Sequence, residues 1–196
     1  MAAYVSAVNN AMGAADFFRQ GGVEFLRDAW LAAEFGQHRQ SSSVRLVPER
    51  DQWPDFAARG GDVIERVECA EADISGRRRG DEYREAEKRN AGGGPVVVDD
   101  PLEDWVSRAD QAPAALSAVI ATKIGKRYAG RASLLINLNI SEFGIRQTEI
   151  EAAMTPAVVP ALACFERVWI LWKASSMGRG LHEQRLPAAF PTVSNF

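Results

Sequence analysis

The amino-acid sequence predicts an α/β protein with a mixed central sheet flanked by helices. Two observations predict this class. Short segments that alternate apolar and polar residues, as half-buried strands do, are interspersed with longer segments whose apolar residues recur at helical spacing. The first strands follow one another through short turns, whereas the later strands alternate with helical segments. The early strands are therefore expected to be antiparallel, and the later ones to be joined by parallel crossovers.

Each element has its own local signal. Apolar residues at helical spacing predict the first helix over residues 14–36, which Gly36 is suited to end. The triplet at residues 60–62 (Gly-Gly-Asp) is typical of a hairpin turn, and residues 63–72 alternate strictly between two faces. The expected order is helix 14–36, strand 44–47, a strand opening at Trp53, strand 63–72, a polar helix from about Asp81, helix 101–126 with an interruption near Pro113, and strand 133–140. A helix that begins at Gln147 and is bent or ended by Pro156 and Pro160 follows, and then strand 167–173.

A chain of 196 residues is expected to form one domain with a full hydrophobic core. We predict a flexible N-terminus over residues 1–13, a single domain over residues 14–174, and an irregular tail over residues 175–196, which is rich in glycine and proline. The sequence contains no apolar run of about 18 residues and no signal-peptide pattern, so we expect no association with a membrane.

The residue counts exclude several kinds of site. With only two histidines (His38 and His182) and two cysteines (Cys69 and Cys164), the chain lacks the ligands of a His-rich metal site or a structural zinc site. A phosphate-binding P-loop motif is also absent. Because both cysteines lie in apolar segments, we interpret them as reduced core residues and expect a cytoplasmic protein.

Two basic clusters interrupt a chain whose net charge is −3. Such clusters suit contacts to nucleic-acid phosphates, although the chain as a whole does not favour nucleic acid. The first cluster has an alternative role in local pairing with the acidic residues that follow it, and the second has an alternative role as an ordinary solvated helix end. The clusters are Arg77, Arg78 and Arg79, and Lys123, Lys126, Arg127 and Arg131 around Tyr128.

Two carboxylates are expected to meet at one edge of the sheet. Asp55 opens one strand of the predicted hairpin and Glu68 lies late in its partner strand. Carboxylates together with a backbone carbonyl form a hard-oxygen site for Mg²⁺ or Mn²⁺, which neutralises a phosphodiester and activates a bound water. The alternatives are that Asp55 is a turn or cap carboxylate after proline and that Glu68 is a surface strand residue paired with Arg66 or a neighbour.

These residues resemble the motif of the PD-(D/E)xK nuclease superfamily. The matching positions are Pro54-Asp55 and Glu68-Cys69-Ala70, and the element order resembles the superfamily's restriction-endonuclease-like core, α-β-β-β-α-β-α-β. The resemblance implies a metal-dependent nuclease that acts on DNA, with Mg²⁺ or Mn²⁺ held by Asp55 and Glu68. It also implies a third acidic ligand on the first helix, a position that Glu34 matches.

The sequence departs from this motif at one position. The superfamily places a lysine two residues after the glutamate, where this chain has Ala70. Lys123 and Lys126 are the candidates to replace it from a neighbouring helix, where a lysine would position the attacking water and stabilise developing charge. Without such a replacement the protein would be an inactive member of this fold that binds nucleic acid or a protein partner. A third alternative is an assembly protein that forms a homodimer through an apolar face around Trp172.

Overall fold

The computed structural model describes residues 24–47, 53–77, 79–89, 107–126, 132–140, 146–175 and 178–184. Within these residues the chain forms strands, α-helices and one 3-10 helix. In chain order they are α3 (Glu24–His38), β1 (Ser43–Leu46), β2 (Phe56–Gly60), β3 (Val63–Ala72), α4 (Arg79–Arg89), α6 (Ala112–Gly125), β4 (Ser133–Leu138), α7 (Gln147–Val158), η2 (Val159–Ala163), β5 (Val168–Ser175) and β6 (Gly178–Gln184).

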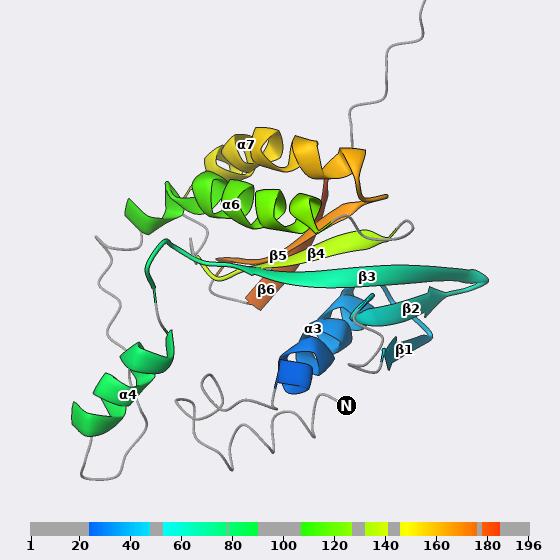
Figure 1. Ribbon diagram of the computed structural model, residues 1–196, viewed down its shortest axis with the longest axis horizontal. Helices are drawn as coiled ribbons and strands as arrows, with labels where there is room; N and C mark the ends of the chain where they lie inside the picture. Colours follow the sequence, from blue (N-terminus) through cyan, green and yellow to red (C-terminus); the bar gives the residue numbers. More distant parts are fainter. Residues whose placement is uncertain are drawn as a thin grey trace, which may run out of the picture.

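The strands form one mixed sheet in the order β1-β2-β3-β4-β5-β6. The pairs β1–β2 and β2–β3 are antiparallel, whereas β3–β4 and β4–β5 are parallel. In Figure 1, α6 and α7 lie on one side of the sheet, α3 lies on the other, and α4 stands apart from it. The predicted mixed sheet flanked by helices is therefore confirmed, as are the tight β2–β3 hairpin and the two parallel crossovers.

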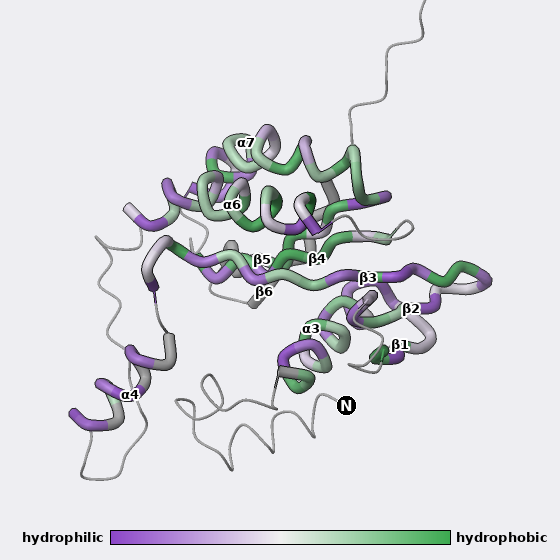
Figure 2. Tube along the Cα trace, in the orientation of Figure 1, coloured by the Kyte–Doolittle hydropathy of each residue, from purple (hydrophilic) through white to green (hydrophobic). Residues whose placement is uncertain are grey.

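Alternation along the strands creates a separate core on each face of the sheet. On the face toward α6 and α7, side chains such as Leu134, Ile136 and Trp172 are fully buried. On the face toward α3, Leu135 and Trp169 pack with Phe35, whose ring meets the indole edge-to-face. The hydropathy colouring in Figure 2 shows the central strands as hydrophobic and α4 as largely hydrophilic. Burial on both faces explains why β4 carries three apolar residues in a row, Leu134 to Ile136, and not an alternating pattern.

The β2–β3 pairing ends before β3 does. The last paired residues are Phe56 and Val67. From Val67 to Ala72, β3 pairs with β4 on its other side. Among the described strands, residues 68–72 of β3 therefore present an edge without a strand partner. This edge lies between α3 on one face and α6 on the other, and it is where the predicted carboxylates lie.

Three expectations are corrected by the structure. Part of the expected irregular tail is the strand β6, which pairs antiparallel with β5. Trp172 is fully buried and donates a hydrogen bond from Nε1 to the carbonyl oxygen of Ile140 at 2.6 Å, so it belongs to the core and not to a dimer face. Cys164 is exposed, whereas Cys69 is buried as expected, and both are free thiols.

Some helix boundaries also differ. The helix α7 continues through Pro156 and ends at Val158, two residues before Pro160, so of the two prolines expected to bend or end it, Pro156 does not end it. The expected helices over residues 14–23 and 101–106, and the expected flexible segment over residues 1–13, lie outside the described residues. None of the described helices is long and apolar enough to cross a membrane.

Candidate functional site

Asp55 lies at the free edge of β3, at the point where β2 begins. It lies one residue before β2 and directly after a cis peptide bond between Trp53 and Pro54. Its Oδ2 atom accepts a hydrogen bond at 2.6 Å from the backbone N–H of Cys69. Cys69 lies two residues beyond Val67, the last residue of β3 that pairs with β2, so the carboxylate satisfies an N–H that β2 does not reach. The structural role expected as the alternative for Asp55 is therefore present.

Glu68 and Lys123 form a buried ion pair across the sheet–helix interface. The Glu68 side chain is 5% exposed, and its Oε1 atom lies 2.5 Å from Nζ of Lys123 on α6. Alternation along β3 directs Glu68 and Ala70 to the same face, toward α6. Glu68 is therefore not a surface residue paired with Arg66. The ammonium group reaches the glutamate from α6, across the face on which the small Ala70 side chain also lies.

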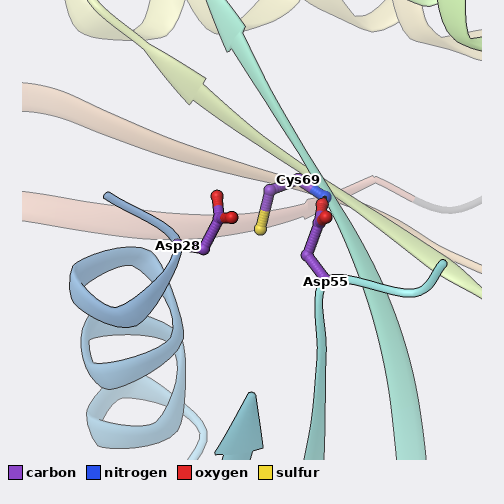
Figure 3. A group of neighbouring side chains, drawn as sticks. All are labelled: Asp28, Asp55 and Cys69. Carbon is purple, nitrogen blue, oxygen red and sulfur yellow. Dashed lines mark hydrogen bonds between the residues drawn. The ribbon is translucent and has the colours of Figure 1, made fainter. Parts of the chain in front are cut away.

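A group of potential metal ligands lies on the opposite side of β3 from Glu68. The carboxylates of Asp28 and Asp55 and the thiol of Cys69 bring ligand atoms within 4.8 Å of one another. Figure 3 shows the Cys69 sulfur between the two carboxylates, with Asp28 projecting from α3. These three side chains come from a helix, from the residue before β2 and from β3, so only the tertiary fold assembles them.

A cavity of about 360 Å³ opens along this edge. Its lining includes Asp28 on α3, Cys69 and Ala70 on β3, and Lys123 on α6. Arg27 and Glu71 also line it, and their side chains approach each other to 3.6 Å. The cavity therefore reaches both sides of the free edge, with Asp28 and Cys69 on one side and Lys123 on the other.

The acidic groups disfavour one another's ionisation. Burial, reinforced by the negative charge of Asp55, raises the pKa of Asp28 to about 6. Burial also raises the pKa of Asp55, and Glu68 adds to the increase, while the hydrogen bond from Cys69 and the charges of Lys123 and Lys126 oppose it. Burial raises the pKa of the Cys69 thiol well above its usual range, with Asp55 and Asp28 contributing. A bound cation would relieve this repulsion.

This arrangement has the chemical requirements for metal-assisted hydrolysis. Asp55 and Asp28 offer hard oxygen ligands, and strand geometry directs the Cys69 carbonyl toward the same free edge as its N–H. Lys123 supplies a positive charge beside Glu68. A divalent ion here would supply Lewis-acid polarisation and a lowered pKa for a bound water.

The predicted site residues divide into those that the structure brings together and those that it does not. Asp55, Glu68 and Lys123 converge at the free edge. Lys126 is exposed at the C-terminal end of α6 and acts on Asp55 only through its charge. Glu34 is half-buried and lies outside both the acidic group and the cavity lining, and Asp28 on the same helix is found there instead.

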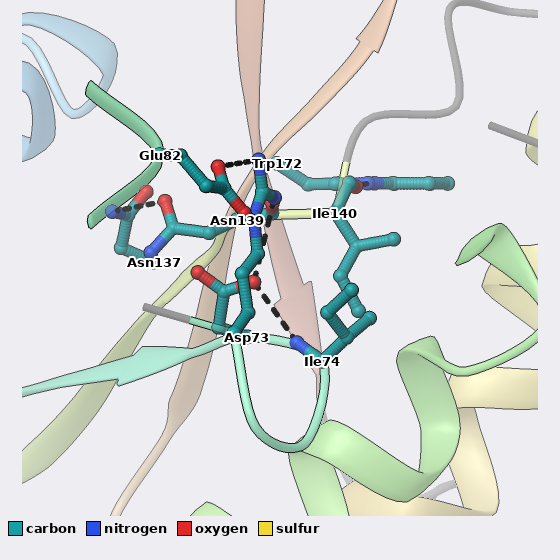
Figure 4. A network of polar contacts seen from close by, with 8 residues as sticks. Asp73, Ile74, Glu82, Asn137, Asn139, Ile140 and Trp172 are labelled. Atoms are coloured by element: carbon teal, nitrogen blue, oxygen red, sulfur yellow. Dashed lines mark hydrogen bonds and ion pairs between the residues drawn. The ribbon is translucent and has the colours of Figure 1, made fainter. Parts of the chain in front are cut away.

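The predicted phosphate-binding role of Arg77 is not supported by its contacts. Its guanidinium donates from Nε and Nη2 to the carboxylate of Glu82 at 2.9 and 3.0 Å, and its Nη1 lies 3.5 Å from Asp73. Nη1 also donates to the Asn139 carbonyl oxygen, so Arg77 connects α4 to the carboxyl ends of β3 and β4. Figure 4 shows this polar network, in which Asn137 donates to Asn139. The alternative role in local pairing is therefore the one found.

The other predicted phosphate contacts cannot be placed. Arg78, Arg127 and Arg131 lie outside the described residues, and Arg79 begins α4 without a described side chain. No described contact therefore supports a phosphate-binding role for these arginines.

Sequence reasoning missed Asp28 and the Cys69 side chain, although a signal for Asp28 was present. Asp28 lies three residues before Leu31 and seven before Phe35, and both are fully buried. This i, i+3, i+7 spacing places Asp28 on the inward stripe of α3. Glu34 lies six residues after Asp28, which corresponds to about 120° around the helix and about 9 Å along its axis. The sequence offers no comparable signal for the Cys69 thiol.

Comparison with known proteins finds no matching family model, curated protein or solved structure.

Proposed function

We propose that this protein is a metal-dependent phosphodiesterase that acts on nucleic acid, with a PD-(D/E)xK-like site in a restriction-endonuclease-like core. In this proposal Asp55 holds a divalent ion such as Mg²⁺ or Mn²⁺, and Glu68 is the second motif carboxylate. Asp28 replaces Glu34 as the acidic residue from the first helix. Lys123 takes the role of the lysine that is missing at Ala70.

The observation that carries the proposal is the contact between Lys123 and Glu68. In the motif, the lysine must lie beside the glutamate so that its charge acts on the attacking water and on the phosphate. Here the Lys123 ammonium lies 2.5 Å from the Glu68 carboxylate, and both Lys123 and Ala70 line the cavity. An inactive site would be expected to show a lysine that points away from the glutamate, whereas Lys123 contacts Glu68 directly.

The substrate class follows from the chemistry of the site. Acidic ligands hold a cation, and a cation beside a lysine suits an anionic phosphodiester. Among the described residues, Arg27 and Lys123 place positive charge at the cavity lining, and Lys126 acts on Asp55 through its charge. DNA is the substrate that the motif resemblance implies, and it is the first to be tested.

The test is cleavage of plasmid and single-stranded DNA in Mg²⁺ or Mn²⁺. The wild type is compared with Asp55→Asn, Glu68→Gln and Lys123→Met, each checked for folding by circular dichroism. We expect metal-dependent cleavage that falls by about 10²-fold or more in each variant. Activity retained in Lys123→Met would contradict the proposed role of the lysine, and no cleavage of any DNA or RNA by the wild type would refute the proposal.

Two matched controls come from α4. Lys88→Met removes an exposed lysine and Glu85→Gln removes an exposed carboxylate, and neither residue lines the cavity. Both variants are expected to cleave at the wild-type rate. Equal loss in the controls would indicate a general charge effect on substrate binding and not a role for the individual site residues.

A further inference from the structure

The buried thiol of Cys69 distinguishes this site from one built of oxygen ligands alone. Cys69 is 7% exposed and lines the cavity. Cys69 is not in a disulfide, and its described hydrogen bond is made by its backbone N–H and not by the sulfur. The sulfur lies instead within 4.8 Å of carboxylate oxygens of Asp28 and Asp55 (Figure 3).

We infer that Asp28, Asp55 and Cys69 form a mixed carboxylate–thiolate metal site that binds borderline-soft divalent ions of the Zn²⁺ and Co²⁺ type in preference to Mg²⁺. The inference deepens the proposed function and rests on it, because Asp55 belongs to both ligand sets. It names the class of ion that the site takes. It also assigns the Cys69 sulfur a role that the nuclease-like motif does not supply.

The ligand types determine this preference. Mg²⁺ requires near-ideal octahedral coordination by oxygen and has little affinity for sulfur. Thiolate ligands select softer ions, and Zn²⁺ accepts cysteine sulfur together with aspartate oxygen. Three protein ligands leave one position of a tetrahedral ion open, which is the arrangement of catalytic and not of structural zinc sites. The cavity beside the three ligands has room for a water or a phosphate oxygen at that position.

The geometry requires only a small rearrangement. In tetrahedral zinc coordination the ligand atoms lie about 3.3–3.8 Å apart, given bonds of about 2.0–2.3 Å. The three atoms here lie within 4.8 Å of one another, so any two of them must approach by about 1.5 Å or less. Side-chain rotation at the half-buried Asp28 can supply much of this closure. On binding, the S–H bond breaks, the proton passes to solvent, and a sulfur electron pair bonds to the ion.

The test uses Co²⁺ as a spectroscopic substitute for Zn²⁺. Metal-free protein is titrated with Co²⁺ while thiolate-to-cobalt charge-transfer absorption is followed in the near ultraviolet. Cys69→Ser removes the proposed ligand, and Cys164→Ser is the matched control, since Cys164 is the exposed second thiol. We expect the band in the wild type and in Cys164→Ser, and its loss in Cys69→Ser. Absence of the band in the wild type, or its survival in Cys69→Ser, would overturn the inference.

Two further arms keep the result clear if Cys69→Ser folds poorly. Asp28→Asn changes a half-buried ligand and is expected to weaken Co²⁺ binding by about tenfold or more. Excess Mg²⁺ is expected to leave the cobalt band in place. Loss of the band when Mg²⁺ is added in excess would contradict the proposed preference. DNA cleavage is measured separately. Cleavage without a cobalt band refutes only this inference, whereas a Cys69-dependent band without cleavage refutes only the proposed function.

Discussion

At the scale of single residues, the buried pair of Glu68 and Lys123 determines the properties of the candidate site. Two opposite charges in contact inside a protein contribute little net stability, because desolvation offsets their attraction. Removal of one partner is costly, since the other charge is then left buried without compensation. The pair is therefore suited to holding the ammonium group in place beside the cavity.

The first prediction tests this asymmetry. We expect Lys123→Met to lower the free energy of unfolding by about 3 kcal/mol, because the Glu68 carboxylate stays buried without its partner. The double variant Lys123→Met/Glu68→Gln should recover much of this loss. Urea denaturation measures both effects, with the exposed Lys88→Met as control. An equal loss in the single and double variants would mean that the charge pair is not the cause.

The second prediction concerns the ionisation of Asp28. Its pKa is raised from 3.8 to about 6 in the folded protein. Between these two pH values, the folded state holds a proton that the unfolded state has lost. The contribution of Asp28 to stability therefore falls as pH rises from about 4 to about 6, and its full cost is present above pH 6. With solvent screening, that cost is about 1–2 kcal/mol.

The substitution Asp28→Asn removes this cost. In metal-free buffer we expect the variant to be more stable than the wild type at pH 7.5 by about 1–2 kcal/mol, and equally stable at pH 4. Thermal unfolding at the two pH values measures the difference. A stabilisation that is the same at both pH values would show that ionisation of Asp28 is not responsible.

At the scale of elements, the placement of α3 against the sheet depends on a close approach to β1. A Cβ atom added at Gly36 would lie 2.5 Å from Cγ2 of Val44, which is too close for any real contact. Glycine is therefore required here for the distance between helix and strand and not for an unusual backbone angle. The same approach positions Asp28 over the free edge, since both residues lie on α3.

The third prediction follows from this contact. Gly36→Ala should lower the free energy of unfolding by about 1–3 kcal/mol, because α3 must shift to relieve the overlap. Gly125, at the end of α6, has open space where its Cβ would lie, so Gly125→Ala is the matched control. That variant is expected to be unchanged or more stable by up to about 1 kcal/mol. Chemical denaturation measures the free energy of unfolding of both variants. Equal changes in Gly36→Ala and Gly125→Ala would contradict the packing explanation.

At the scale of the whole molecule, the free edge of β3 separates two acidic groups, and the cavity reaches Asp28 and Cys69 on one side of the edge and Lys123 on the other. Glu68 lies on the face toward α6, and Asp28 and Cys69 lie on the face toward α3. Asp55 lies at the edge itself, where it accepts the Cys69 N–H. Unfolding would disperse these groups, so a cation held among them is expected to bind the folded state alone.

The fourth prediction is that Mn²⁺ stabilises the folded protein. At a concentration of 100 times Kd, binding to the folded state alone contributes about 2.7 kcal/mol. We expect the Tm to rise with Mn²⁺, to return to its starting value with a chelator, and to be insensitive to Mn²⁺ in Asp55→Asn. The exposed Glu85→Gln serves as control and should respond like the wild type. If Mn²⁺ raises the Tm of Asp55→Asn as much as that of the wild type, the ion does not bind at Asp55.

Much of the fold could be predicted because its signals are local. The alternation over residues 63–72 coincides with β3, and the Gly-Gly-Asp triplet coincides with the β2–β3 turn. The strand β6 was not predicted, since its sequence, Gly-Arg-Gly-Leu-His-Glu-Gln, contains two glycines and little apolar character. Its partner β5 provides the backbone hydrogen bonds that make it a strand, and residue propensity does not reveal such a partner.

The sequence by itself determined the order of most strands and helices and the convergence of Asp55 with Glu68, because a short hairpin leaves adjacent strands little freedom. Only the tertiary structure decided that Lys123 and not Lys126 meets Glu68, and that Asp28 and not Glu34 faces the free edge. It also decided that Arg77 is held by Glu82. The physical reason is distance along the chain. Spacing specifies a side chain's face on its own element, whereas contacts between elements depend on how helices pack against the sheet.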